Sequence, residues 1–242
     1  MELEFLPLGD CGVRIKFGSE ISPVITAHIR RFGAALDAAP LPGTTEWVYG
    51  YAVVTLYYRP WIIGYEDLCA ALRRLNEAEA TFSEAAFAER VIEIPVCYGG
   101  GFGPDLEEVA AWHRLTAAQV TDLHSQPLYR VYFLGFLPGF AYLGGLPPSL
   151  ETPRRSSPRS SVPAGAVGIA GEQTGVYPLE TPGGWQIIGQ TPLRLYDPQR
   201  ETPALLSAGD QVKFVPIAPN RYRELEETER EKTGRGKRNA PG

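Results

Sequence analysis

Cysteine and histidine are scarce in this sequence, with three of each, and the six residues are scattered. Three cysteines cannot form a complete set of disulfides, and neither residue type recurs at metal-ligand spacing, such as two histidines one turn apart on a helix. We therefore expect a reduced, cytoplasmic protein with no metal site in this chain. The residues are Cys11, Cys69, Cys97, His28, His113 and His124.

The chain also lacks a long apolar run and an excess of positive charge. Its first residues, MELEFLPLGDCG, have no basic region followed by an apolar stretch, and we expect neither a signal peptide nor a membrane span. The formal net charge of -5 gives no electrostatic footprint for nucleic acid. With 242 residues, 44% hydrophobic and 21% charged, the composition is typical of a globular protein of one large or two modest domains.

Residues 1–85 predict a small α/β domain. Apolar residues alternate in the expected strands and recur at helical spacing in the expected helices. These elements are strands Leu3–Phe5 and Val13–Phe17, a helix from Ser22 to Ala38, strands Thr45–Tyr49 and Ala52–Tyr58, and a helix Tyr65–Glu79. The ββαββα order predicts a two-layer sandwich with both helices on one face of the sheet. His28 lies on the apolar face of the first helix, and we interpret it as a packed structural residue.

Residues 86–218 predict a second, mostly β domain. A glycine-rich loop, CYGGGFGPD, follows its first strand, and Asp105 is expected to cap a short helix after it. Short strands bounded by Gly, Pro or Asp suit a closed barrel better than an open sheet. The expected elements are strands Val91–Val96, Tyr129–Phe133, Val167–Ala170, Val176–Leu179, Trp185–Gly189, Leu193–Tyr196 and Gln211–Val215, and helices Leu106–Trp112 and Thr116–Ser125. Residues 219–242 are highly charged, so we expect a frayed helix and then a disordered tail.

Three features of the stretch Tyr129–Gly189 could bind a small ligand. In the turn Gly135–Phe140, backbone N–H groups could bind an anion beside aromatic walls, although a plain hairpin corner is the alternative. Three arginines among prolines could bind a carboxylate or phosphate, or else contact solvent or an acidic partner. Segment 171–186 offers neutral hydrogen-bonding groups and flat aromatic surface, which would suit a small amide or urea-like molecule.

His124 is the histidine best placed for a site. It ends the helix that leads into this stretch, where the helix terminus would stabilise its cation, and simple capping is the alternative. The predicted catalytic residues are His124, Arg154, Arg155 and Arg159. The predicted substrate-binding residues are Tyr129, Phe136, Pro138, Gly139, Phe140, Gly171, Gln173, Thr174, Tyr177, Trp185 and Gln186.

The motifs of a self-sufficient enzyme are missing from the sequence. The triple glycine of CYGGGFGPD lacks the lysine and hydroxyl of a P-loop. No G-x-S-x-G elbow occurs, and the stretch Tyr129–Gly189 holds no cysteine. We therefore do not expect a self-sufficient nucleophilic hydrolase.

Long motifs resemble the family of allophanate hydrolase subunit 1, also called the KipI family. They are PLGDCGVRIKFG, IPVCYGGGFGPDLEEVA, HSQPLYRVYFLGFLPGFAYLGGLP and TPRRSSPRSSVPAGAVGIAGEQTGVYPLETPGGWQIIGQTPLRLYD, and the likeness covers nearly all of residues 3–217. The resemblance implies an α+β fold, with a small α/β domain followed by a cyclophilin-like β-barrel. It also implies an active site in the barrel that a partner subunit completes, and we therefore predict that this chain is inactive alone.

Function divides within this family. The resemblance implies the B subunit of an ATP-dependent 5-oxoprolinase, which opens 5-oxoproline to L-glutamate. Its partners would be a subunit-2 type (PxpC/KipA-like) protein and a LamB/YcsF-like (PxpA) protein, and the complex would bind ATP with Mg²⁺. The alternatives are an inhibitor of a sensor histidine kinase and a carboxyltransferase or allophanate hydrolase component of urea metabolism.

Overall fold

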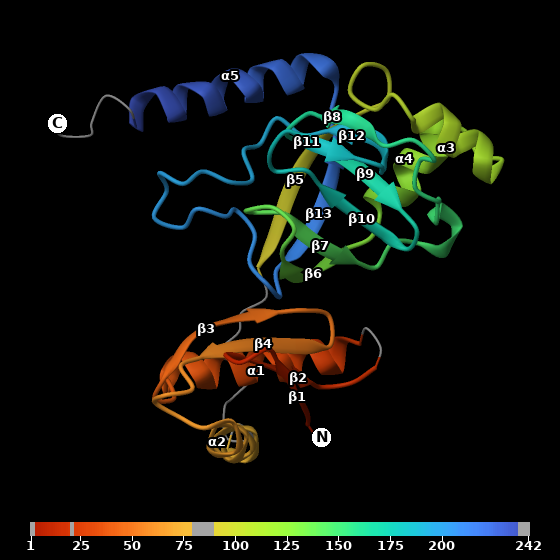
Figure 1. The fold of residues 1–242 in the computed structure, drawn as a ribbon. Helices are drawn as coiled ribbons and strands as arrows, with labels where there is room; N and C mark the ends of the chain where they lie inside the picture. Colours follow the sequence, from red (N-terminus) through yellow and green to blue (C-terminus); the bar gives the residue numbers. More distant parts are fainter. Residues whose placement is uncertain (1–2, 20–21, 79–89, 237–242) are drawn as a thin grey trace. The chain divides into compact units, whose positions relative to one another are not determined.

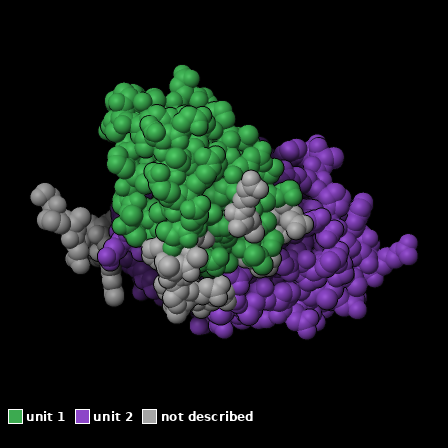
Figure 2. Space-filling model, turned by 90° about the horizontal axis from the view of Figure 1, so that it is seen from below, with its two compact units in different colours: residues 1–89 green, residues 90–242 purple. Residues whose placement is uncertain are grey.

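The computed structural model describes residues 3–19, 22–78 and 90–236. The chain divides into two compact units, Met1–Glu89 and Arg90–Gly242, which Figure 2 shows in different colours. Each unit has its own cluster of buried apolar side chains. Of the described helices, none is both long and apolar enough to cross a membrane.

The first unit has the ββαββα order expected from the sequence (Figure 1). Its elements are β1 Glu4–Leu8, β2 Gly12–Lys16, α1 Pro23–Ala38, β3 Thr44–Tyr49, β4 Val53–Tyr58 and α2 Tyr65–Ala78. The strands form an antiparallel sheet in the order β1-β2-β4-β3. Alternation along β2 buries Val13 and Ile15 and exposes Arg14, so one face of the sheet packs on the helices.

His28 is a packed residue of this first core, as predicted. Its ring Nε2 lies 2.7 Å from Asn76 Oδ1, and the ring meets Phe17 edge to face at 4.9 Å. The predicted helix start is also confirmed, because the Ser22 side chain accepts a hydrogen bond from the backbone N–H of Val24. The described residues of this unit therefore build a scaffold around an apolar core.

The second unit is built on a closed seven-stranded barrel in the order β10-β7-β6-β13-β5-β12-β9. These strands are β5 Val91–Tyr98, β6 Tyr129–Leu134, β7 Ala141–Gly144, β9 Ala166–Ala170, β10 Gln173–Val176, β12 Gln186–Gln190 and β13 Gln211–Pro216. Strands β8 Arg159–Val162 and β11 Thr181–Gly183 pair as a separate ribbon. Helices α3 Leu106–His113 and α4 Ala117–Ser125 and the short 3-10 helix η3 Pro148–Leu150 complete the unit before its last helix.

Strand β9 lies between two clusters of buried apolar side chains. All five of its residues are buried. Val167 and Ile169 belong to the main barrel core, whereas Ala166 and Ala170 pack in a second cluster with Phe140, Tyr177 and Trp185. Since successive side chains of a strand point to opposite faces, this second cluster lies on the other side of β9 from the main core.

Two predicted strands are wrong. The predicted strand Val176–Leu179 shares only Val176 with β10, Gln173–Val176, because the chain turns already at Gly171 and pairs back on β9 from Gln173 onward. The predicted strand Leu193–Tyr196 is not a strand, because Tyr196 makes only an isolated bridge to Ala204. The helix expected at the start of the charged tail is present: α5 spans Pro219–Gly236, so helix extends over most of the segment, and residues 237–242 lie outside the described part.

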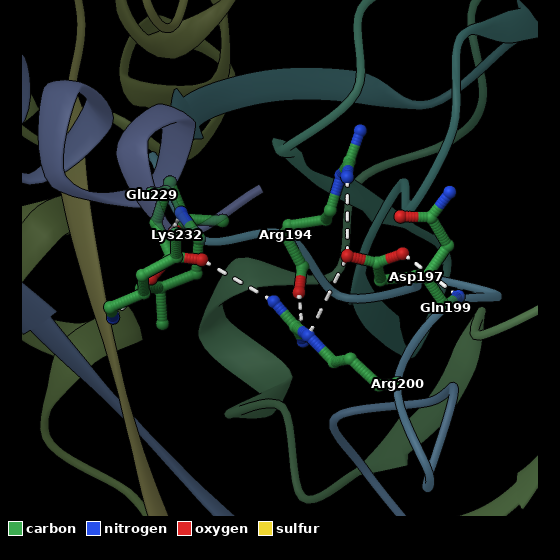
Figure 3. A network of polar contacts seen from close by, with 8 residues as sticks. Arg194, Asp197, Gln199, Arg200, Glu229 and Lys232 are labelled. Atoms are coloured by element: carbon green, nitrogen blue, oxygen red, sulfur yellow. Dashed lines mark hydrogen bonds and ion pairs between the residues drawn. The ribbon is translucent and has the colours of Figure 1, made fainter. Parts of the chain in front are cut away.

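Packing and charge pairing explain why α5 forms. Its Tyr222 is only 6% exposed, and the ring lies 4.6 Å from that of Phe102. Along the helix, pairs such as Lys232–Glu229 join neighbouring turns, and such pairs add small increments of helix stability. Arg200 links the helix to a loop of the barrel, since it lies 3.4 Å from Glu229 and donates to the Arg194 carbonyl (Figure 3).

Candidate functional site

A pocket of about 290 Å³, here called the aromatic pocket, opens over the second apolar cluster. Four separate segments build it: the turn after β6 with β7, the arginine segment, the end of β10, and the link from β11 to β12. Its lining residues are Phe136, Phe140, Tyr142, Arg154, Tyr177, Pro182, Gly183, Gly184 and Trp185. The fold thus gathers several of the predicted substrate-binding residues around one hollow.

Edge-to-face contacts hold the aromatic walls in place. The Phe140 ring, 2% exposed, lies 5.7 Å from Tyr177, 5.6 Å from Trp185 and 5.1 Å from Tyr142. Such T-shaped pairs stabilise one fixed arrangement of rings. The pocket is therefore a preformed apolar surface.

Phe136 forms the exposed edge of the aromatic pocket. It is 65% exposed and has a φ of 68°, in the left-handed region that a residue with a Cβ rarely adopts. Hydrogen bonds on either side of it hold this turn, from Leu137 N to Gly135 O at 2.8 Å and from Gly135 N to Phe140 O at 3.0 Å. The turn places an aromatic ring beside the pocket at the cost of local strain.

Tyr177 is, with Tyr142, one of two tyrosines that line the aromatic pocket. Burial raises the pKa of this phenol, while a hydrogen bond with the Trp185 backbone and the charges of Arg154 and Arg159 act in the opposite direction. The pocket wall leaves no room beside this hydroxyl, because a Cβ added to Gly183 would lie 2.6 Å from it. The phenol therefore stays neutral at physiological pH and can act only as a hydrogen-bonding group there.

A second pocket of about 220 Å³, here called the polar pocket, shares Arg154 with the first. It is lined by Glu108, Val109, Trp112, Thr152, Pro153, Arg154, Arg155, Ser156 and Gln186. Gln186 donates from Nε2 to the Pro153 carbonyl at 3.1 Å, while its buried Oε1 has no partner in the described part of the chain. Trp112, 64% exposed, stands at the edge of this pocket.

The three predicted arginines have different surroundings. Arg155 and Arg159 both donate to Asp105 Oδ1, at 3.0 and 2.6 Å. Arg154 is exposed, lines both pockets, and makes no hydrogen bond or ion pair within the described residues. Of the three, Arg154 is therefore the guanidinium available to an anionic ligand.

Asp105 does not cap α3 as expected. Its side chain makes no capping hydrogen bond. The carboxylate, in a residue only 3% exposed, instead accepts from both arginines and, at 2.6 Å, from the backbone N–H of Ile187. Sequence reasoning missed this role because the partners lie 50, 54 and 82 residues away.

His124 is buried in the barrel core and cannot touch a ligand in either pocket. It is 0% exposed, and burial lowers the pKa of its imidazole to about 3. The Thr174 hydroxyl donates to the Gly168 carbonyl at 3.0 Å, so His124 Nε2, 2.8 Å away, must be the donor to Thr174. Nδ1 then accepts from the Tyr98 hydroxyl at 2.8 Å. The expected cation at the helix end is wrong, because the ring is desolvated and neutral.

The remaining predicted residues divide between the pockets and the scaffold. Phe136, Phe140, Tyr177 and Trp185 line the aromatic pocket, and Gln186 lines the polar one. Tyr129 and Thr174 are fully buried: the Tyr129 hydroxyl donates to the His124 carbonyl, and the Thr174 hydroxyl is hydrogen-bonded to the His124 ring. Pro138, Gly139, Gly171 and Gln173 are not among the residues that line either pocket. No cluster of three or more His, Cys, Asp or Glu suited to a metal ion occurs within the described ranges.

Comparison with known proteins gives close relatives. The family model for the carboxyltransferase domain, subdomain C and D, matches residues 3–206. The 5-oxoprolinase B subunit of Bacillus subtilis is 45% identical over 229 residues, covering 91% of this chain and 95% of the relative. The same protein of Escherichia coli O157:H7 is 48% identical over 200 residues (81% and 90%), and that of Haemophilus influenzae is 51% identical over 149 residues (62% and 70%).

Solved structures share the fold. The crystal structure of TTHA0988 is 41% identical with a TM-score of 0.75, covering 86% of this chain. This chain spans 40% of the length of that one. PH0987 of Pyrococcus horikoshii is 45% identical with a TM-score of 0.54, covering 90% of this chain and 100% of its own.

The urea amidolyase of K. lactis has a TM-score of 0.76 at 19% identity, over 94% of this chain and 15% of its own length, which shows the fold alone. The match of the family model over most of the sequence and the identity to the three bacterial 5-oxoprolinase proteins are independent of that distant likeness. The chain belongs to the family of carboxyltransferase domains, subdomain C and D.

Proposed function

We propose that this chain is the B subunit of a 5-oxoprolinase and takes part in opening 5-oxoproline to L-glutamate with hydrolysis of ATP. The observation that carries the proposal is the identity of 45–51% to the 5-oxoprolinase B subunits of three bacteria. Two of these alignments extend over at least 90% of the relative. The likeness therefore covers both compact units and is not confined to one shared domain.

The two pockets that share Arg154 support 5-oxoproline as the substrate. 5-Oxoproline is a small five-membered ring that carries one carboxylate and one amide. We propose that Arg154 binds the carboxylate, since guanidinium and carboxylate pair through two parallel hydrogen bonds. The ring would lie against the aromatic walls around Phe140, in a hollow of suitable size.

The composition of the pockets also supports a chain that needs a partner. The aromatic pocket is lined by no carboxylate and no histidine, and of its two phenols, Tyr142 and Tyr177, the second has a raised pKa. The aromatic pocket thus has no carboxylate or imidazole to accept a proton. The carboxylate of the polar pocket, Glu108, lies 4.0 Å from Arg155. The exposed rings of Phe136 and Trp112 stand at the pocket edges, where another chain could cover them and exclude water.

Other subunits of the complex are the partners that this assignment implies. We propose specifically a subunit-2 type (PxpC/KipA-like) protein and a LamB/YcsF-like (PxpA) protein, with ATP and Mg²⁺ bound by the complex. A bound nucleotide would supply the phosphoryl group that drives the opening of the amide. Arg154 and the aromatic walls would orient 5-oxoproline in this chain. The cytoplasmic location expected from the sequence stays a prediction.

Reconstitution tests the proposal. The purified chain is assayed for release of glutamate from 5-oxoproline with ATP, alone and with both proposed partners. We expect activity only from the full set, and we expect Arg154→Ala to raise KM by at least about tenfold, because it removes both charged hydrogen bonds to the carboxylate. Arg223→Ala, at an exposed arginine on α5, is the matched control and should leave KM unchanged.

Two outcomes would contradict these claims separately. Full activity of the chain alone would refute the dependence on partners. Equal KM values for wild type and Arg154→Ala would refute the carboxylate-binding role of Arg154, while leaving the assignment to the complex intact. No observation favours the histidine kinase inhibitor, and the likeness to urea amidolyase at 19% identity supports the fold only.

A further inference from the structure

We propose that Asp105 is a positioning residue for the substrate site: it fixes the arginine segment so that Arg154 faces both pockets. This inference rests on the proposed function, because it assumes that Arg154 binds the substrate. Asp105 lines neither pocket and would act only through its neighbours.

Asp105 joins three parts of the chain. Its Oδ1 accepts from Arg155 Nη1 and Arg159 Nη2, and its Oδ2 accepts from Ile187 N. Its own backbone N–H donates to the Ile187 carbonyl at 2.9 Å. The loop before α3, the arginine segment and β12 are thus held together by one buried carboxylate. Hydrogen bonds to a charged group are stronger than those between neutral groups.

Arg155 transmits this constraint to Arg154. The Arg155 side chain is bound to Asp105, and its backbone N–H donates at 2.8 Å to the carbonyl of Gly184, a residue of the aromatic pocket. Both the side chain and the backbone of Arg155 are therefore fixed. Arg154 precedes it directly, so its backbone is held at one end while its side chain stays free for a ligand.

The carboxylates around Arg155 and Arg159 leave Arg154 as the unpaired guanidinium. Asp105 accepts from both Arg155 and Arg159, and the exposed Glu108 lies 4.0 Å from Arg155 Nη1. Two carboxylates thus balance these two guanidinium groups, and the charge of Arg154 has no ion-pair partner within the described residues. Arg155 and Arg159 are hydrogen-bonded to Asp105. A substrate carboxylate therefore meets one free guanidinium, that of Arg154, in a defined place.

If Asp105 had a purely structural role, Asp105→Asn would lower stability without a specific change in KM. The chain offers a matched control for this comparison. Asp197 is also a buried carboxylate, 7% exposed, that accepts from Arg194 at 3.2 Å and from the Gln199 backbone at 3.1 Å (Figure 3). It lines neither pocket. Asn at either position should destabilise the barrel, but only Asp105→Asn should change substrate binding.

The experiment compares Asp105→Asn, Asp197→Asn and wild type in the full chain, with and without the proposed partners. We expect Asp105→Asn to raise KM for 5-oxoproline about tenfold with kcat changed less than about threefold, since an orienting contact is lost. Asp197→Asn should leave both constants near the wild-type values. Equal KM for the two Asn variants would overturn the proposal.

Arg159→Gln keeps the test decisive if Asp105→Asn does not fold. Arg159 lines neither pocket, and Asp105 is its hydrogen-bonded link to the arginine segment, beside the longer-range effect of its charge on Tyr177. We expect a KM increase of about threefold, the loss of one net hydrogen bond. An unchanged KM in this variant would count against the proposal.

A readout without activity separates this inference from the proposed function. Hydrogen exchange of the Arg155 backbone amide, measured by NMR on the full chain, should be at least about tenfold faster in Asp105→Asn or Arg159→Gln than in wild type or Asp197→Asn. Unchanged exchange would overturn the positioning role. A wild-type complex without activity would refute the proposed function, and the exchange rates would still report on Asp105.

Discussion

The imidazole of His124 has a hydroxyl group on each side and no contact with solvent. Tyr98 donates to one ring nitrogen, and the other donates to Thr174. The Phe214 ring stacks on it at 4.7 Å. A proton added to this ring would be a buried charge with no counter-ion among these contacts, which explains the direction of its pKa shift.

The first prediction concerns pH. The folded pKa of His124 is about 3, below its ordinary value of 6.5, so below pH 6.5 the unfolded chain binds a proton that the folded chain does not. Stability should therefore fall by up to about 1.4 kcal/mol per pH unit from this group as pH drops from 6.5 toward 3. Above pH 6.5 the contribution is complete.

Two measurements check this prediction. The NMR shift of the His124 ring should stay constant from about pH 8 to about pH 4.5. Urea unfolding at several pH values should show a steeper loss of stability in wild type than in His124→Gln, which lacks the titrating group. A ring that titrates near its ordinary pKa of 6.5 would contradict the prediction.

The roles of single residues were harder to predict from the sequence than the helices and strands. The roles of Asp105 and His124 depend on partners that lie far away along the chain, such as Ile187 and Thr174. Local patterns suggested a helix cap for one and a helix-end cation for the other, because those patterns describe only neighbouring turns. By contrast, Phe140, Tyr177 and Trp185 could be selected by residue type, since aromatic side chains commonly line small-molecule pockets.

At the scale of elements, the loop between β5 and α3 depends on close approach to β12. Gly99 N donates to the Ile188 carbonyl at 3.1 Å, and Gly103 N donates back to Gly99 O at 3.0 Å. A Cβ at Gly103 would lie 2.0 Å from Ile188 O, which is a backbone atom and cannot move aside locally. This contact brings Asp105 against β12.

The second prediction uses two glycines of this loop. Gly103→Ala should lower the free energy of unfolding by about 1–3 kcal/mol, because the loop must move away from β12. Gly101→Ala is the control, since nothing lies within 4 Å of its added Cβ, and it should change stability by less than about 0.5 kcal/mol. Urea denaturation measures both, and equal values for the two variants would contradict the close approach.

Most strands and helices were predictable from sequence because they carry strong periodic patterns. The alternation in β2 and the cap at Ser22 led to correct elements. Predictions were less accurate where tertiary contacts determine the structure. The charges along α5 predicted a frayed helix before a disordered tail, yet burial of Tyr222 and ion pairs between turns support a helix as far as Gly236. The ribbon of β8 and β11 was missed because strands this short carry no clear period.

On the scale of the whole molecule, two separate apolar cores predict two units that fold independently. The buried clusters around Phe32 and around Phe214 share no residue. A fragment of residues 90–242 should therefore fold alone, and its NMR spectrum should reproduce the barrel resonances of the full chain. A fragment with the poorly dispersed spectrum of an unfolded chain would contradict this third prediction.

The barrel has a further consequence for how the protein is made. Its first strand, β5, pairs in parallel with its last strand, β13, so that Gln211 lies opposite Val91. Strand β13 also separates β5 from β6. During synthesis the barrel cannot close until Pro216 has left the ribosome, and until then one edge of β5 and one edge of β6 stay unpaired. Such non-local pairing slows folding and leaves open edges to be shielded on the growing chain.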